Sequence, residues 1–299
     1  MAIPFIRELS FEYGAVAEVA PQVGRVIANN PSAFTFHGTG TFIVGDRSVA
    51  VIDPGPDDPA HVAALLSALD GREVTHILIT HTHVDHSPAA KALQAATGAP
   101  TYGYGPHAEG RFERGQTVEA GADTRFVPDH RVQHGEVLEG NGWTIECVHT
   151  PGHCSNHICY QLRQERILFT GDHVMGWSTS VVSPPDGDMG EYMASLRLLL
   201  DRDDRLYLPT HGAGIGAPKP FVEAFIAHRL AREQQILASL EAGRDRIDAM
   251  VAVMYADVPA MLHPAAARSV LSHMLHMLER DVIACEGEPG LQARYRLGE

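Results

Sequence analysis

Three imidazoles and a carboxylate crowd into one short stretch of the sequence. His81, His83, Asp85 and His86 lie within a run of six residues. Imidazole and carboxylate groups are the ligands that suit zinc and its divalent neighbours. Without a cation, the stretch would only bring polar groups together at the expense of their hydration. The spacing therefore predicts a metal-binding loop rather than a polar loop with incidental histidines.

A strand and a helix must hold this loop. Residues 74–79 are mostly apolar or β-branched and predict a buried strand that ends at the loop. On the other side, Ser87 and Pro88 predict a helix cap and a first helical residue, and Gly98 marks the expected end of that helix.

Further potential ligands follow other predicted strands in the same way. They are His153 after residues 143–149, Asp172 after residues 167–170, and His211 after residues 206–208. Asp53 similarly follows a predicted strand over residues 48–52. Each apolar run ends in a turn that contains Gly or Pro. Sites in layered α/β structures are usually assembled from loops at one edge, so these side chains are expected to converge.

The remaining elements follow from periodicity and turn residues. The predicted strands are residues 33–36, 41–44, 102–104 and 158–162, and the predicted helices are residues 59–69 and 189–200. Residues 105–140 show weak periodicity and are expected to form surface loops with short strands.

The composition changes near residue 217, which divides the chain into a predicted domain over residues 1–216 and another over 217–299. The second contains predicted helices at 221–240, 246–254 and 264–283, and a Gly-rich end at 287–298 that could close a hairpin. Three helices and a hairpin suggest a winged-helix module, and a cap over the site or a homodimer surface is the alternative. After residue 218, nine Lys and Arg stand against eleven Asp and Glu, so the basic footprint of a nucleic-acid reader is missing.

The whole chain reads as an ordinary globular protein. It has 299 residues, 44% hydrophobic and 20% charged, with a formal net charge of −14. That charge gives no general attraction to nucleic acid or to an anionic membrane. No apolar run approaches the roughly 20 residues of a membrane span, and the first residues lack a signal-peptide pattern. Four cysteines form no dense disulfide framework, so a cytoplasmic location is expected.

The motifs together resemble the metallo-β-lactamase superfamily. They are His-Thr-His-Val-Asp-His at 81–86, Thr-Pro-Gly-His at 150–153, Gly-Asp at 171–172, Pro-Thr-His-Gly at 209–212, and Asp-Pro-Gly upstream at 53–55. They follow the family's order over about residues 30–215. The resemblance implies a four-layer αββα sandwich of two mixed sheets. The C-terminal helices resemble the lactamase-β-2-like subgroup, in which a small winged-helix domain follows the catalytic one.

The resemblance also implies a ligand set for two metal ions. His81, His83 and His153 would hold one ion, Asp85, His86 and His211 would hold the other, and Asp172 would bridge them. Asp53 is expected to orient a ligand rather than bind. The classical antibiotic-degrading members have a cysteine ligand where Asp172 stands. His83, rather than a glutamate, indicates hydrolytic zinc and not the diiron oxygen-reducing branch. Manganese or iron(II) is the alternative in one of the two sites.

Two cations about 3.5–4 Å apart can share a bridging water and lower its pKa towards 7, which yields a hydroxide nucleophile. Asp85 and Asp172 are therefore the expected catalytic carboxylates, with Asp172 also positioning the nucleophile. His157, His173 and Tyr192 are candidates for the proton donor to the leaving group, although a structural role is the preferred interpretation of each. Cys154, beside a ligand, reads as a bystander.

The leading hypothesis is thus a binuclear zinc hydrolase of a small ester, thioester, lactone or amide. The alternative is a single-strand-selective endoribonuclease of the lactamase-β-2-like type, for which RNA would be the partner. A third interpretation is a DNA-binding regulator with a metal sensor domain. A closed apolar pocket favours the small molecule, a basic aromatic-lined groove favours the nuclease, and salt-sensitive duplex binding favours the regulator.

Overall fold

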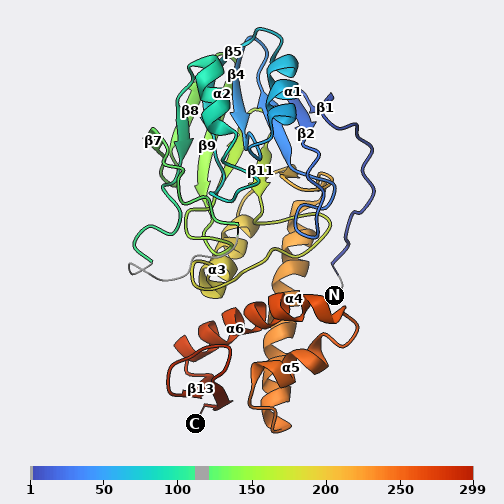
Figure 1. Ribbon diagram of the computed structural model, residues 1–299, viewed down its shortest axis with the longest axis vertical. Coiled ribbons are helices and arrows are strands. Elements are labelled where there is room, and N and C mark those ends of the chain that lie inside the picture. The colour runs from blue at the N-terminus through green and yellow to red at the C-terminus, as the bar shows by residue number, and fades with distance from the viewer. Residues whose placement is uncertain (1–2, 112–120, 299) are drawn as a thin grey trace.

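A computed structural model describes residues 3–111 and 121–298 of the chain. Two sheets lie face to face, and helices cover both outer faces (Figure 1). The strands of the first sheet, in spatial order, are β1 (Val16–Ala20), β2 (Val23–Ile27), β3 (Gly40–Val44), β4 (Ser48–Ile52), β5 (Glu73–Leu78), β6 (Thr101–Gly103) and β7 (His130–Arg131). Those of the second are β12 (Leu206–Pro209), β11 (Ile167–Gly171), β10 (Ile158–Leu162), β9 (Trp143–His149) and β8 (Val137–Gly140).

Both sheets are mixed. In the first sheet, β1 to β4 pair antiparallel, and β4 to β7 pair parallel. In the second, β8 to β11 pair antiparallel, while β11 and β12 run parallel. As a result, β4, β5, β9, β11 and β12 end at the same edge of the sandwich. That edge faces the C-terminal helices in Figure 1.

Three apolar layers hold the sandwich together, as the alternation of side chains in its strands requires. Between the sheets, Phe42 and Ile52 pack against Tyr160 and Phe169. On the outer face of the first sheet lie α1 (Pro59–Leu69) and α2 (Ala90–Thr97), and on that of the second lie α3 (Met189–Leu200) and the first half of α4 (Pro218–Glu241). The expected four-layer αββα architecture is confirmed.

The C-terminal part contains α5 (Ile247–Met254), the 3-10 turn η1 (Ala260–Leu262), α6 (His263–Glu279) and a hairpin of β13 (Ile283–Glu286) and β14 (Arg294–Leu297). This is the helical winged-helix arrangement that the sequence suggested. Helix α4 belongs to both parts: Phe221 and Phe225 join the core of the second sheet, whereas Ile236 packs with Met250 and Met274. The division at 216/217 stays a prediction, because one helix is shared across it.

Several expectations about elements are wrong. Residues 33–36 form a turn region rather than a strand, and β1 and β2 were not predicted. Helix α2 begins at Ala90, since the Ser87 hydroxyl donates to the carboxylate of Asp123 instead of capping a helix. Helix α6 ends at Glu279 rather than at residue 283, which lies in β13. Part of the predicted 105–140 loop region, residues 112–120, lies outside the described residues.

Within residues 3–111 and 121–298, no helix is long and apolar enough to cross a membrane.

Candidate metal centre

The seven predicted ligands meet at the edge where five strands end. His81, His83, Asp85 and His86 follow β5 of the first sheet. His153 follows β9, Asp172 follows β11, and His211 follows β12, all of the second sheet. Side chains that are up to 130 positions apart in the sequence therefore face one another across the two sheets.

One group of ligand atoms is built from three imidazoles. Nδ1 of His83 lies 3.0 Å from Nε2 of His81 and 3.1 Å from Nε2 of His153. The sulfur of Cys154 joins this group, in which all ligand atoms lie within 4.8 Å of one another. Nitrogens spaced in this way can share one tetrahedral zinc ion, for which zinc–nitrogen distances are about 2.0–2.1 Å.

A second group combines imidazoles with carboxylates. Nε2 of His211 lies 3.2 Å from Oδ2 of Asp85 and 3.4 Å from Oδ1 of Asp172. Nε2 of His86 lies 3.5 Å and 3.6 Å from the same two oxygens. Asp172 also reaches the first group, since its Oδ2 lies 3.9 Å from Nε2 of His153. The carboxylate of Asp172 is thus placed between the two groups.

In His86, His153 and His211, the ring nitrogen that faces away from the centre is already bonded to the protein. Nδ1 of His86 lies 2.9 Å from Oδ2 of Asp53, which is where a ligand-orienting carboxylate was expected. Nδ1 of His153 donates to the carbonyl of Val181 at 2.5 Å, and Nδ1 of His211 donates to that of Gly38 at 3.1 Å. These bonds select the tautomer in which Nε2 carries a lone pair towards the centre.

The all-imidazole group favours uncharged rings. Burial lowers the pKa of His81 well below its usual range, and the rings of His86 and His83 lower it further. Burial and the nearby ring of His83 bring the pKa of His153 to about 4. Neutral imidazole is the form that binds a metal, so this half of the site is ready for a cation near neutral pH.

In the second group of ligand atoms, which contains the carboxylates, the pKa of a histidine is raised instead of lowered. Burial alone would lower the pKa of His86, but the carboxylates of Asp85 and Asp172 raise it well above its usual range. Burial alone would raise the pKa of Asp172, but the rings of His211 and His86 hold it below its usual range. The half-buried carboxylate of Asp85 and the buried carboxylate of Asp172 therefore demand positive charge at this position.

Unpartnered atoms show that the residues fit a bound metal. Nε2 of His86, Nε2 of His211 and Oδ1 of Asp172 are buried without a hydrogen-bond partner in the described part of the chain. Buried polar atoms are normally satisfied, and here three of them point to one place. A divalent cation would satisfy all three, and its preferred ligands are these nitrogens and oxygens.

The structure gives little support to the candidate proton donors. The Tyr192 hydroxyl is buried and donates to the carbonyl of His173 at 2.8 Å. Nε2 of His157 accepts from the backbone N–H of Asp172 at 3.2 Å. His173 is fully buried behind the ligands. All three lie in the wall of the site rather than at its opening, which favours a structural role for each.

Sequence reasoning missed several parts of the site. It treated Cys154 as a bystander, whereas the structure places its sulfur among ligand atoms. It also missed Thr80 and Thr210, whose hydroxyls both donate to Asp53, at 2.7 and 2.9 Å. The Val181 carbonyl could not have been found, since a backbone group has no signature in the sequence.

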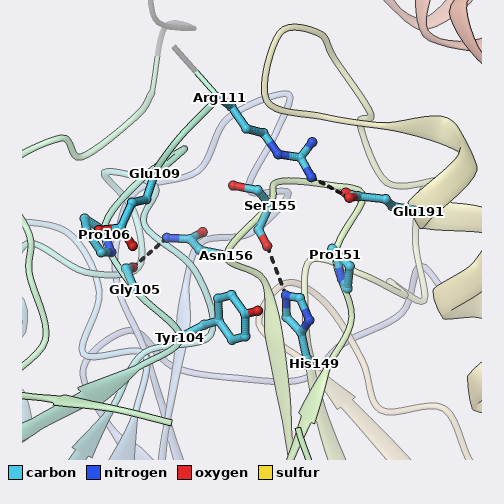
Figure 2. Close-up of a pocket in the computed structure, with 10 residues that line it drawn as sticks. All are labelled: Tyr104, Gly105, Pro106, Glu109, Arg111, His149, Pro151, Ser155, Asn156 and Glu191. Carbon is cyan, nitrogen blue, oxygen red and sulfur yellow. Dashed lines mark hydrogen bonds and ion pairs between the residues drawn. The ribbon is translucent and has the colours of Figure 1, made fainter. Parts of the chain in front are cut away.

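A small polar pocket lies beside the metal loop (Figure 2). Its volume is about 240 Å³. Tyr104 and His149 stack at its base with ring centroids 3.7 Å apart, and Arg111 pairs with Glu191 at its opposite side. Asn156 connects the pocket to the metal loop, because its Nδ2 donates to the hydroxyl of Thr82 at 2.8 Å. The pocket is open and polar. It is therefore neither the closed apolar pocket expected for a small molecule nor the basic, aromatic-lined groove expected for RNA.

Comparison with known proteins supports both parts of the fold. Residues 35–211 match the sequence profile of the metallo-beta-lactamase superfamily, and residues 247–291 match that of the beta-lactamase associated winged helix domain. A beta-lactamase-like protein 2 homolog from Drosophila melanogaster is 34% identical, over 89% of this chain and 91% of the relative. An atrochrysone carboxyl ACP thioesterase from Aspergillus chevalieri is 29% identical, over 90% of this chain and 82% of the relative.

A solved structure shares the same fold. The beta-lactamase domain protein from Burkholderia ambifaria superimposes with a TM-score of 0.78 at 19% sequence identity. The match covers 95% of this chain and 94% of that one, so the two parts of the chain occur together in a known structure.

Proposed function

Because the chain belongs to the metallo-β-lactamase superfamily and is a hydrolase of that fold, we propose that it is a binuclear zinc-dependent hydrolase of a small ester, thioester, lactone or amide. The observation that carries this proposal is the pair of ligand groups that share Asp172. The thioesterase named among its relatives favours a thioester within this class.

Zinc bound by both groups would supply an activated water and a Lewis acid for the carbonyl of the substrate. The residues of the chain position the metal ligands and the attacking water. Asp172 lies between the two groups and is placed to orient the attacking water, and Asp85 completes the second group opposite His211. Asp53 fixes the ring of His86, so the ligand needs no reorganisation during the reaction.

The alternative is a single-strand-selective endoribonuclease, and the winged-helix part of the chain is the observation that favours it. The pocket argues against it. Among the lining residues that the structure describes, the arginine is Arg111, and it is already paired with Glu191 at 2.5 Å. A groove for single-stranded RNA needs unpaired positive charge along the strand. The small-molecule proposal is therefore preferred.

The test is a substrate screen with the zinc-loaded protein. The panel contains thioesters, lactones, a chromogenic β-lactam and single-stranded RNA. Asp85→Ala is expected to lose the second metal and most of the activity, since Asp85 lies in the second ligand group. Elemental analysis measures the metal content of the same samples. Full activity in the variant would contradict the proposal, and cleavage of RNA alone would support the alternative.

A DNA-binding regulator would require salt-sensitive binding to duplex DNA. Measuring such binding by fluorescence anisotropy at two salt concentrations decides that third possibility.

A further inference from the structure

Residues 180–184, called here the 180–184 segment, lie between the C-terminal helices and the metal centre. The segment reaches the centre through one backbone group, the carbonyl of Val181, which accepts from Nδ1 of His153 at 2.5 Å. This bond decides which nitrogen of His153 faces the centre and how its ring is turned. The position of the segment therefore sets the orientation of a metal ligand.

Helix α4 holds one end of the segment. Nη2 of Arg229 donates to the carbonyl of Ser180 at 2.5 Å. Its guanidinium also lies 5.0 Å from the centre of the Tyr192 ring, a cation–π contact with helix α3. Arg229 is only 3% exposed, and no carboxylate pairs with it within residues 3–111 and 121–298. A buried cation without an acidic partner is costly, so its position calls for an explanation beyond packing.

Helix α6 holds the other end. Nε of Arg268 donates to the hydroxyl of Ser183 at 2.7 Å, and its Nη2 donates to the carbonyl of Pro184. The Ser180 hydroxyl ties the segment to the end of β11 through the carbonyl of His173, at 2.7 Å. Two arginines from two C-terminal helices thus hold the backbone on both sides of Val181.

We propose that the C-terminal helices are a working part of the metal centre, because Arg229 and Arg268 hold the 180–184 segment whose Val181 carbonyl orients His153. Both arginines are positioning residues, since they reach the ligand only through the backbone of the segment. This inference rests on the proposed function only in requiring that His153 bind a metal ion.

A measurement of zinc affinity distinguishes the positioning of His153 from adhesion, by which we mean that the arginines only hold the two parts of the chain together. Adhesion predicts that removing either arginine lowers the free energy of unfolding and leaves the zinc affinity of the folded protein unchanged. Positioning predicts a weaker zinc site in a protein that remains folded. Removing a partner that orients a ligand typically weakens metal binding by about 10–100-fold.

The experiment uses the full chain and zinc alone as the probe. Arg229→Met and Arg268→Met are titrated with zinc against a chromophoric chelator, and circular dichroism reports their folding. We expect the affinity for the zinc ion that His153 would hold to fall about tenfold or more in each variant. Arg229→Lys and Arg268→Lys, which retain one positively charged donor nitrogen, are expected to recover part of that affinity. Cobalt(II) absorption of the same proteins should change in the methionine variants, since it reports the geometry around His153.

Two control variants match these changes. Arg232→Met removes an arginine of the same helix as Arg229. The Arg232 guanidinium lies 4.4 Å from the centre of the Tyr255 ring and bonds to Gln235 and Met254 rather than to the 180–184 segment. Val253→Ala shortens a side chain on α5 that is 54% exposed and lies outside the 180–184 segment. Both are expected to bind zinc as the unaltered protein does.

Unchanged zinc affinity in folded Arg229→Met and Arg268→Met would overturn the inference and leave the proposed function standing. Absence of zinc binding in the unaltered protein would overturn the proposed function itself. If Arg229→Met does not fold, Arg268→Met and Ser183→Ala decide, because both act on the other end of the segment.

Discussion

At the scale of single residues, Asp53 is the hub of the hydrogen bonds around the metal centre. Its carboxylate accepts from the backbone N–H and the hydroxyl of Thr80, from the hydroxyl of Thr210, and from Nδ1 of His86. It is fully buried, so no water replaces these bonds. It belongs to neither group of candidate ligands, yet it connects the loops of both sheets around His86.

We expect Asp53→Asn to weaken zinc binding about 10–100-fold, because an amide nitrogen facing His86 would repel its N–H and turn the ring. Zinc titration against a chelator measures the change. The control is Asp46→Asn, which alters an exposed aspartate in the turn between β3 and β4. Equal affinities for the two variants would show that Asp53 does not orient the ligand.

The seven side chains that meet at the candidate metal centre could be predicted from the sequence because each lies in a short motif directly after an apolar run. The supporting groups could not be predicted in the same way. Val181 and Gly38 act through backbone carbonyls, and any residue carries one. Their role depends on how the loops fold back, which distant parts of the chain decide.

At the scale of elements, the loop that carries His153 is packed directly on helix α3. Gly152 has φ +131°, and a Cβ there would lie 2.3 Å from Cα and 2.4 Å from the backbone nitrogen of Tyr192. A side chain would therefore meet helix backbone, which moves only if the whole helix moves. Gly142 has a positive φ of +91° as well, but a Cβ there has nothing within 4 Å.

Gly152→Ala is expected to destabilise the protein by about 2–4 kcal/mol, since backbone strain and overpacking add. Gly142→Ala is expected to cost about 1 kcal/mol, from strain alone. Urea denaturation measures both free energies of unfolding. Similar losses in the two variants would mean that the loop and α3 do not pack as described.

Helices α1 and α3 were predicted to the residue, and both have an aspartate cap whose side chain accepts a backbone N–H: Asp58 for α1 and Asp188 for α3. Strand β1 was missed because it is mostly exposed and carries no apolar alternation. Residues 33–36 look like a strand by composition, but the Ser32 hydroxyl accepts from the backbone N–H groups of Phe34 and Thr35, which closes a turn.

At the scale of the whole molecule, helix α4 connects the sandwich to the C-terminal part. Because its first half belongs to one apolar core and its second half to another, we expect the chain to unfold in a single transition. Trp143 lies in β9 and Trp177 in the loop between β11 and α3, so neither tryptophan lies in the C-terminal part, whereas α5 and α6 contribute to the far-UV signal. Fluorescence and circular dichroism curves in urea should therefore coincide. Two separate midpoints would contradict this prediction.

Acid should weaken the C-terminal part through His273, which is 1% exposed on α6. Burial lowers its pKa well below the usual value, and the charges of Arg229 and Arg232 and the rings of His228 and His276 lower it further. Below about pH 6.5 the unfolded chain binds a proton at this residue that the folded chain does not. Stability is thus lost as the pH falls, by up to about 1.4 kcal/mol per pH unit.

We expect His273→Met to lose less stability than the unaltered protein between pH 7.5 and pH 5. Urea denaturation of the metal-free proteins at three pH values measures the two slopes. His134→Met, which changes an exposed histidine, is the control and should keep the original slope. Identical slopes in all three proteins would contradict the assignment of acid sensitivity to His273.

The candidate ligands of each group come from both sheets, so a bound ion would cross-link the two sheets of the sandwich. In one group, His81 and His83 follow a strand of the first sheet and His153 follows a strand of the second. In the other group, Asp85 and His86 come from the first sheet and His211 comes from the second. Separating the layers and releasing the ions would then be one event. The lifetime of the loaded molecule should follow the rate of ion escape, and a chelator added to folded protein should shorten it.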